Sequence, residues 1–279
     1  MPAGIDALTS PTLKHLREHW WNDEFTGFLR DTLRPRPGNR ILDVGCGTGT
    51  GEISIGRLHL SQIRLYGVDL VVQHLVTAKQ ETAAHNQRAR FAAADACHLP
   101  FAKESFDSTY CVAVLQHIGD VDSAVQEFAR VTRAGGRIVA VEPDNGARYW
   151  YSSSRAGMRA FETGTRFFSG LARARDSRGD PSVGPKLPTL FVKHAIEPES
   201  VRLFPVSQTT LGAPEGAVWQ NRRLRIQRAI ENAPEPARAA GHEYLDALAA
   251  YEAEAAQAAS GFVEIQTTML FATVGQKTE

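Results

Sequence analysis

The stretch Asp43-Val44-Gly45-Cys46-Gly47-Thr48-Gly49 decides the fold of this chain. It continues the apolar run Ile41-Leu42, which is typical of a short buried strand, and its alternating glycines remove side chains from a sharp turn. The backbone of such a turn can approach a ligand closely, and the helix after it presents free N–H groups. The turn is not a dinucleotide fingerprint, because Thr50 stands where the third glycine of G-x-G-x-x-G would be. It is not a P-loop either, because Gly56 is followed by Arg57 and not by lysine.

Outward from this turn, short apolar runs alternate with helical periodicity through residues 40–142. This alternation predicts an α/β fold, namely a doubly wound, Rossmann-like, mostly parallel sheet of seven strands with helices on both faces. Such a sheet binds ligands at the carboxyl ends of its strands, where the glycine turn stands. The expected strands are 40–44, 63–68, 90–94, 106–114, 137–141, 201–206 and 262–274, and the expected helices of the first half are 11–34, 51–59, 71–87 and 121–132.

We expect a single domain over residues 1–279, with an N-terminal helix at 11–34 and a ligand-binding core at 40–142. The pattern after the core is less regular. Residues 146–180 and 207–259 are interpreted as helical insertions that cap the active edge of the sheet. The second insertion is about fifty residues long, far beyond a usual connection, which indicates a functional role.

The composition argues against several classes of protein. The formal net charge is +0 and the sequence pI is about 7.1, so no nucleic-acid partner is expected. The sequence contains three cysteines, Cys46, Cys97 and Cys111. Because their number is odd, we expect no disulfide framework, and because they lack metal-ligand spacing, we expect no metal site. No apolar run approaches about 18 residues and Met1–Ser10 lacks the layout of a signal peptide, which favours a cytoplasmic protein without membrane contact. The oligomeric state stays open.

Two further acidic residues stand at strand ends, as Asp43 does. Asp69 ends the second expected strand, where a carboxylate can accept both hydroxyl hydrogens of a ribose. Asp95 ends the third strand, where it can accept a hydrogen bond from an adenine amine. A single aspartate in such a place is more often a helix cap or a turn residue. Three of them at successive strand ends, beside a glycine turn, favour a ligand that contains a nucleoside.

Taken together, these residues resemble the core of class I S-adenosylmethionine-dependent methyltransferases, especially the broad group that acts on small molecules. The resemblance covers a little over a third of the chain. One departure is Arg133-Ala134-Gly135-Gly136, where the family usually has Lys-Pro-Gly-Gly. The other matching stretches are Ile41–Gly49, Gly67–Asp69, Asp95–Phe101, Phe106-Asp107 and Val114–Ile118.

The resemblance implies a binding site for S-adenosylmethionine and its product S-adenosylhomocysteine. Asp43 would orient the glycine turn or reach the methionyl amine through water. Asp69 would hold the ribose hydroxyls, with Leu70 against the adenine, and Asp95 with the backbone of Ala96 would read the adenine edge. The other expected cofactor-binding residues are Gly45, Cys46 and Gly47, through backbone groups, and Cys111, which would face the methionyl end.

The residues expected near the methyl acceptor indicate their roles less specifically than the cofactor-binding residues do. His117, after the fourth strand, is the best candidate for a general base, although a histidine here can equally pack or contact the cofactor. The resemblance also implies that Trp20 or Trp21 lies over the site, on the N-terminal helix. Tyr149 and Trp150 would stack on a planar acceptor, or else pack onto the protein core. Glu142, at the end of the fifth strand, either faces the acceptor or bonds backbone in its own turn.

Arginine recurs in the second insertion, at positions 222, 223, 225 and 228. Such a run can form an anion-binding face, but it is more often a solvated surface. The same choice applies to Arg148, beside the aromatic residues of the first insertion, because arginine can pair with a carboxylate or phosphate.

The favoured function is methyl transfer to a small molecule, with the acceptor atom and the pathway left open. One alternative is a methyltransferase acting on protein or nucleic acid. Against it stand the neutral charge and Cys111-Val112-Ala113-Val114, where amino-methylating nucleic-acid enzymes often have Asn/Asp-Pro-Pro-Tyr/Phe. A non-catalytic cofactor-binding module is disfavoured by the intact acidic residues and glycines. A Rossmann dehydrogenase is the least favoured, because the glycine spacing fails.

Overall fold

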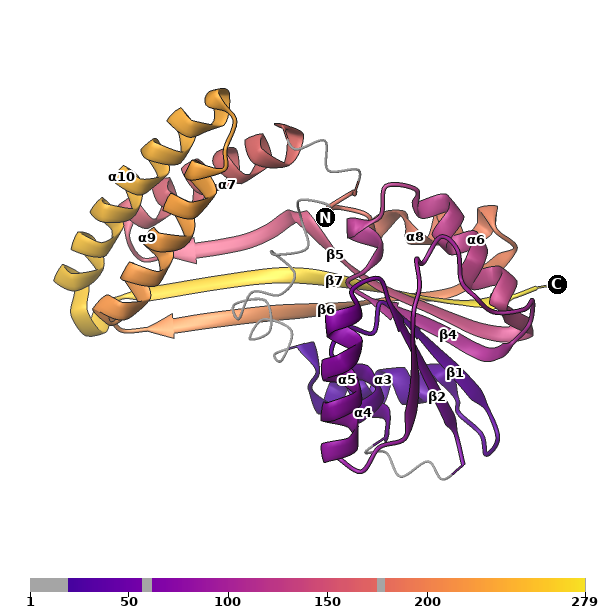
Figure 1. Cartoon of the computed structure of the whole chain (residues 1–279). Helices are drawn as coiled ribbons and strands as arrows, with labels where there is room; N and C mark the ends of the chain where they lie inside the picture. Colours follow the sequence, from indigo (N-terminus) through magenta and orange to yellow (C-terminus); the bar gives the residue numbers. More distant parts are fainter. Residues whose placement is uncertain (1–19, 57–61, 175–178, 279) are drawn as a thin grey trace. The chain divides into compact units, whose positions relative to one another are not determined.

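The computed structural model of the chain describes residues 20–56, 62–174 and 179–278. Its strands form one seven-stranded sheet in the order β3-β2-β1-β4-β5-β7-β6 (Figure 1). The predicted fold class is therefore confirmed. The strands are β1 (Arg40–Val44), β2 (Arg64–Asp69), β3 (Ala89–Ala93), β4 (Phe106–Val112), β5 (Thr132–Ser152), β6 (Ile196–Leu211) and β7 (Val263–Lys277).

The first five strands run parallel, with β1 paired to β2 and β4, β2 to β3, and β4 to β5. Strand β7 runs the other way beside β5. The side chain of Lys277 donates a 2.8 Å hydrogen bond to Thr132 O at one end, and Ser153 N donates to Val263 O at 2.9 Å at the other. The strand order reverses between β1 and β4, and this switch point is where open α/β sheets bind ligands.

Helices cover both faces of the sheet. On one face, α6 (Val121–Val131) and α8 (Leu187–Lys193) pack over strands β1, β4 and β5. On the other, α3 (Asp23–Leu33) and α4 (Thr50–Gly56) pack over the same strands and over β7, and α5 (Val72–Ala84) contacts β2 and β3. The largest fully buried side chains of these two layers are Tyr110, Phe25, Phe106, Phe128, Phe191, Leu29, Ile41, Leu42 and Ile55.

Helix α3 begins at a side-chain cap. Asn22 accepts a 2.9 Å hydrogen bond from the N–H of Phe25, and Asp23 and Glu24 follow in the first turn, where the helix dipole favours negative charge. The expected helix at 11–34 is thus found at its carboxyl end, and residues 11–19 lie outside the described part. Within the described ranges, no helix combines the length and apolar character needed to cross a bilayer.

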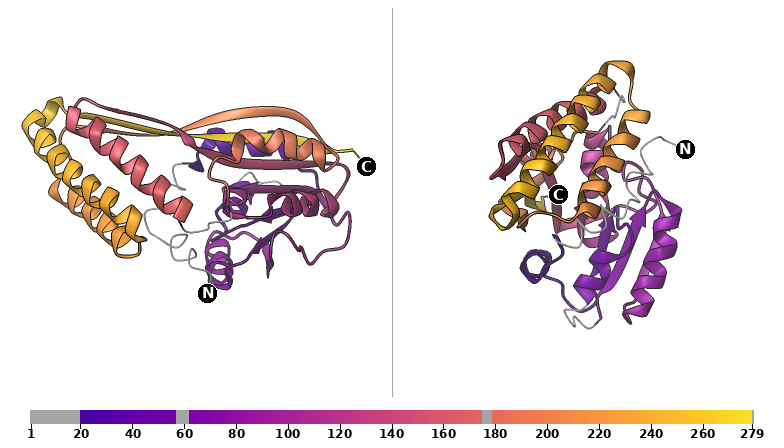
Figure 2. Two further views of the ribbon diagram at one scale, coloured as in Figure 1. Left: turned by 90° about the horizontal axis from the view of Figure 1, so that it is seen from above. Right: turned by 90° about the vertical axis from the view of Figure 1, so that its left-hand side faces the viewer.

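The chain divides into two compact units, each with its own core. The first comprises Met1–Gly146, Gly179–Val206 and Met269–Glu279, and the second comprises Ala147–Arg178 and Ser207–Thr268. The described residues of the second unit include the α-helices α7 (Arg155–Ala174), α9 (Gly216–Glu231) and α10 (Glu235–Ala258). Helix α10 packs against both α7 and α9, and Figure 2 shows the three side by side. Their shared core includes Phe167, Leu171, Trp219, Ile226, Leu248, Tyr251 and Phe262.

The expected end of the fifth strand at Val141 is wrong, because β5 continues to Ser152. Residues 146–152, expected to open an insertion, therefore extend a strand. The glycine pair Gly135-Gly136 interrupts the pairing of β5 with β4, because the register moves from Phe106↔Thr132 to Ser108↔Arg137. Gly135, with φ +70°, lies in this interruption. Apolar and polar residues mix after Val141, which hid the continuation from a reading based on periodicity.

Candidate functional site

The glycine turn after β1 is held against two neighbouring strands. The N–H groups of Gly45 and Cys46 donate to the carbonyl oxygen of Val68, on β2, at 2.7 and 3.0 Å. Gly45 has φ +74°, and a Cβ there would lie 2.3 Å from Cγ2 of Val114, just after β4. Only glycine combines this backbone conformation with so close an approach. The turn therefore lies at the switch point between β1 and β4.

Asp69, at the end of β2, connects this turn to the next helix. Its Oδ2 accepts the N–H of Gly47 at 2.9 Å, and its Oδ1 accepts the N–H of Val71 at 2.8 Å and lies 3.2 Å from Nδ1 of His74. Burial acts to raise the pKa of Asp69, but these hydrogen bonds outweigh it and hold the pKa below its usual value. Asp69 is therefore an ionised acceptor, and a carboxylate has about four acceptor positions, so it can bind further donors.

Leu70 and Asp95 follow two neighbouring strand ends. Leu70 is 63% exposed, which is unusual for a leucine beside a buried core. Asp95 is exposed, and its Oδ1 accepts the N–H of Cys97 at 2.9 Å, closing a turn around the half-buried Ala96. Oδ2 of Asp95 lies 3.9 Å from His98. Both side chains are thus accessible to a ligand at the carboxyl edge of the sheet.

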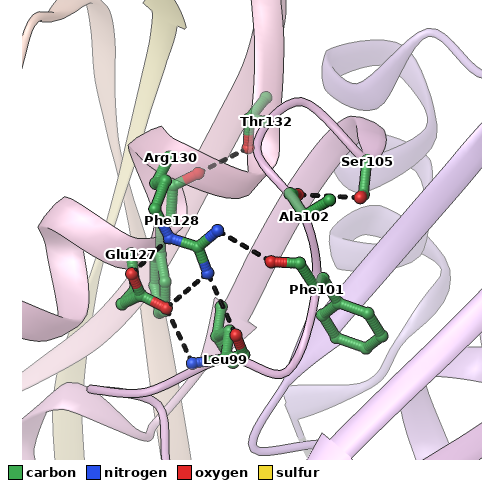
Figure 3. A network of polar contacts seen from close by, with 8 residues as sticks. All are labelled: Leu99, Phe101, Ala102, Ser105, Glu127, Phe128, Arg130 and Thr132. Carbon is green, nitrogen blue, oxygen red and sulfur yellow. Dashed lines mark hydrogen bonds and ion pairs between the residues drawn. The ribbon is translucent and has the colours of Figure 1, made fainter.

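An ion pair on α6 fixes the loop after Asp95 (Figure 3). Arg130 donates to Leu99 O at 3.0 Å and to Phe101 O at 2.7 Å, and Nη2 of Arg130 lies 2.8 Å from Oε2 of Glu127. Oε2 of Glu127 also accepts the N–H of Leu99 at 2.7 Å. Because the loop backbone is bonded at three points, Asp95 and Ala96 are carried on a rigid connection.

Two carboxyl groups are buried beside the glycine turn. Asp43 is 4% exposed, and Glu52, in the first turn of α4, is 0% exposed. A Cβ at Gly67, the strand neighbour of Asp43, would lie 2.4 Å from Oε1 of Glu52 and 2.8 Å from Sγ of Cys46. Among the described residues, neither oxygen of Glu52 has a hydrogen-bond partner. Burial raises the pKa of Asp43 to about 7, and burial and the charge of Asp43 raise the pKa of Glu52.

Glu142 bonds the loop after β4 and not the turn after its own strand. It is fully buried, and its carboxylate accepts the N–H groups of Val114 and Leu115 at 2.7 Å and of Gln116 at 3.2 Å. These groups form the start of η1 (Leu115–His117), a short 3-10 helix. Burial raises the pKa of Glu142 to about 7, although the three backbone donors act against the shift. Glu142 therefore shapes the loop that touches Gly45 and carries His117.

The other expected residues lie in different surroundings. His117 is exposed at the end of η1. Cys111 is fully buried in the core, with Sγ 3.8 Å from Oε1 of Glu142, and burial raises the pKa of its thiol. Trp20 is half-buried against the core under α3. In the second unit, Tyr149 is 59% exposed, whereas Trp150 stacks on Phe161 with ring centroids 5.0 Å apart.

The structure thus brings together Gly45, Cys46, Gly47 and Asp69, as expected from the sequence. Sequence reasoning missed His74 and Glu52, and it left the direction of Glu142 open. A usable signal for Glu52 was present, because a carboxyl group directly after a glycine turn, inside the first helical turn, has little access to water. No comparable signal pointed to Glu142, whose partners lie on another strand end.

Known proteins share these features. Residues 42–140 match the family model that describes a methyltransferase domain. This segment of the chain is therefore similar to a methyltransferase domain. It includes the glycine turn, Asp69, Asp95 and His117, so the site described above lies within the matched segment.

Relatives of known name match part of this chain. An O-methyltransferase of Pyrenophora dematioidea is 37% identical over 108 residues, which is 38% of this chain and 40% of the relative. The demethylmenaquinone methyltransferase of Mycobacterium marinum is 31% identical over 135 residues, covering 48% of this chain and 53% of the relative. The chain thus spans about half the length, or less, of the curated relatives it matches.

Solved structures share the fold over most of the chain. The YcgJ protein of Bacillus subtilis superposes with a TM-score of 0.57 at 18% identity, covering 92% of this chain and 100% of that one. At this identity the likeness shows the fold alone.

Proposed function

We propose that this protein binds S-adenosylmethionine and transfers its methyl group to a small-molecule acceptor, leaving S-adenosylhomocysteine. The observation that carries the proposal is the position of the glycine turn. Gly45 lies against Val114 at the β1–β4 switch point, and Gly47 is bonded to Asp69. A nucleoside ligand at this point meets the start of helix α4, an ionised carboxylate and an exposed apolar side chain.

Different residues of the site suit the ribose, adenine and methionyl parts of the cofactor. Asp69 would accept the ribose hydroxyls, Leu70 would lie against the adenine, and Asp95 with the backbone of Ala96 would bond the adenine edge. Gly45, Cys46 and Gly47 would contribute backbone contacts. The buried carboxyl group of Asp43 would complement the positive charge of the methionyl ammonium, directly or through water. The cofactor supplies an activated methyl group, so the protein need only position the acceptor in line and exclude water.

His117 is the proposed general base for an acceptor that must lose a proton. It ends η1, whose first N–H groups are held by the carboxylate of Glu142. Histidine is the side chain that most often acts as a general base, and His117 is exposed. Acceptors that attack through carbon or an already ionised oxygen would not need it, so the base matters for neutral hydroxyl, thiol and amine acceptors.

We also propose that the second unit supplies most of the acceptor pocket. The support is chain connectivity, because β5 leads from Glu142, at the loop after β4, into Ala147 and the exposed Tyr149. Trp20 would contribute from the N-terminal side. Trp150 already packs on Phe161 and on Tyr251, with ring centroids 5.0 and 5.8 Å apart, which leaves the exposed Tyr149 as the more accessible of the two proposed aromatic contacts.

Calorimetric titration of the full chain tests the cofactor proposal. We expect S-adenosylhomocysteine to bind and NAD not to bind, because the glycine spacing does not suit a dinucleotide. Binding of NAD without binding of S-adenosylhomocysteine would contradict the proposal. Since a fold alone does not fix a reaction, methyl transfer needs its own assay. Incubation with S-adenosylmethionine carrying a labelled methyl group and a panel of small phenols, carboxylates and amines should give a labelled product.

A further inference from the structure

Aromatic side chains of α7 and α10 meet on an accessible part of the second unit. Phe168, on α7, is 38% exposed, and its ring contacts Tyr244 of α10 edge to face, with centroids 6.1 Å apart. Gly164, one turn earlier on α7, lets the two helices approach, because a Cβ there would lie 2.8 Å from the ring of Tyr244. The exposed edge of Phe168 therefore continues into the phenol of Tyr244.

A positive charge lies over this aromatic pair. The guanidinium of Arg225, on α9, lies 6.0 Å from the ring centroid of Phe168. Its helix neighbours are neutralised, since Arg222 forms two hydrogen bonds with Glu264, at 2.7 and 2.9 Å, and Arg223 pairs with Glu252. Arg225 differs from both, because within the described residues it forms no ion pair with a carboxylate. Its charge is thus available to an incoming anion.

We propose that Arg225, Phe168 and Tyr244 form a binding site for a small organic anion, in which a carboxylate or phosphate is attached to an aromatic or other apolar body. The guanidinium of Arg225 would bind the oxyanion, which arginine can contact through two parallel hydrogen bonds. The exposed edge of Phe168 and the ring of Tyr244 would contact the apolar body. The assignment of this anion as the methyl acceptor rests on the proposed function, whereas the binding site stands on the second unit alone.

Three probes of one shape test the site by calorimetry on the full chain: 1-naphthoate, 1-naphthyl phosphate and the neutral 1-naphthalenemethanol. We expect at least one of the two anions to bind, and the alcohol to bind about tenfold more weakly or not at all. The stronger anion identifies the head group. Failure of both anions to bind, or equal binding of the neutral alcohol, would overturn the proposal.

Matched variants of α9 test whether the anion contacts Arg225 itself or responds only to the positive charge of the helix. Arg225→Gln should weaken binding of the preferred anion by about tenfold or more, and Arg225→Lys by less. Arg228→Gln removes the same charge from an exposed position one turn later and should leave binding unchanged. Equal losses in the two glutamine variants would contradict the site. Titration of S-adenosylhomocysteine into the same samples keeps the two proposals apart, since each ligand can fail to bind without the other.

Discussion

The backbone N–H of Gly47 donates a 2.9 Å hydrogen bond to Oδ2 of Asp69, and this bond joins the glycine turn after β1 to the end of β2. The residue expected to bind a ribose therefore also holds the turn expected to contact the rest of the cofactor. Val71 and His74 contact the other oxygen of the same carboxylate. One side chain thus holds two backbone N–H groups and a histidine side chain before any ligand arrives, which is the kind of preorganisation that lowers the cost of binding.

Replacement of Asp69 tests this arrangement. Asp69→Ala should weaken the binding of S-adenosylhomocysteine by more than about tenfold, because hydrogen bonds to a charged acceptor contribute roughly 1.5–3 kcal/mol each. Calorimetric titration measures the loss. Asp31→Ala is the control, since Asp31 is exposed, with a side chain 69% accessible, and pairs with Arg30. An unchanged dissociation constant for Asp69→Ala would make Asp69 a turn residue only.

Gly45→Ala should destabilise the fold. The added Cβ would lie 2.3 Å from Val114, at a backbone φ of +74° that alanine rarely adopts, so we expect a loss of about 1–3 kcal/mol. Urea denaturation followed by circular dichroism measures the change. Val114→Ala in the same chain should restore part of the loss, because it removes the clash and leaves the φ strain.

The control for Gly45 is Gly216→Ala, at the start of α9. A Cβ at Gly216 meets nothing within 4 Å, and helical alanine is favoured over glycine, so this variant should be neutral or slightly stabilising. If Gly45→Ala were as stable as Gly216→Ala, the close packing of the glycine turn on the loop after β4 would be wrong.

Glu142→Gln should destabilise the loop after β4. A glutamine amide offers one acceptor oxygen, and its NH₂ group would face one of the backbone donors of Val114, Leu115 and Gln116. Leaving a buried donor unsatisfied costs about 1–3 kcal/mol. Urea denaturation checks the stability, with Glu235→Gln, whose side chain is 85% accessible, as the control. Identical midpoints for the two variants would exclude a structural role for Glu142.

The buried carboxyl groups predict a pH dependence of stability. Burial raises the pKa of Asp43 from 3.8 to about 7, and it raises the pKa of Glu142 in the same direction, so the native state keeps protons that the unfolded chain releases. The free energy of unfolding should therefore fall as the pH rises from about 5 to about 7, by about 2–4 kcal/mol. Over this range the carboxyl groups whose pKa is lowered, such as Asp69, are ionised in both the native and the unfolded state. Urea denaturation at several pH values measures this slope.

Glu52→Gln tests how much of this pH dependence of stability comes from the buried carboxyl group of Glu52 beside Asp43. Glutamine has the same shape and no charge, so it removes both the buried ionisable group and its effect on Asp43. The variant should match the parent protein at pH 4.5, exceed it in stability at pH 7.5 and show a shallower slope. Glu24→Gln, with a side chain 67% accessible, should leave the slope unchanged. A variant with the parent slope would mean that Glu52 is not buried beside Asp43.

The order of elements and the glycine turn could be predicted from the sequence, because both depend on local chemistry. Alternating apolar runs define buried parallel strands, and the positions of Gly45 and Asp69 follow from where those runs stop. The partners of Glu142 could not be predicted, because Val114 and Leu115 are distant in sequence and only the β4–β5 pairing brings them near. The length of β5 was also hidden, since residues 144–151 are partly or fully exposed and lose the pattern of a buried strand.

The last prediction concerns the proposed acceptor pocket. If the second unit closes over bound ligand, peptides from α7, α9 and α10 should exchange amide hydrogens more slowly when ligand is present, because closure reduces local opening. Hydrogen exchange followed by mass spectrometry compares the free chain with samples containing S-adenosylhomocysteine, alone and together with 1-naphthoate. Peptides from α6, packed in the core of the first unit, serve as the reference and should not change. Identical exchange of α7, α9 and α10 in every state would contradict the capping role, and the pocket would then have to be built by the N-terminal segment around Trp20 and Trp21.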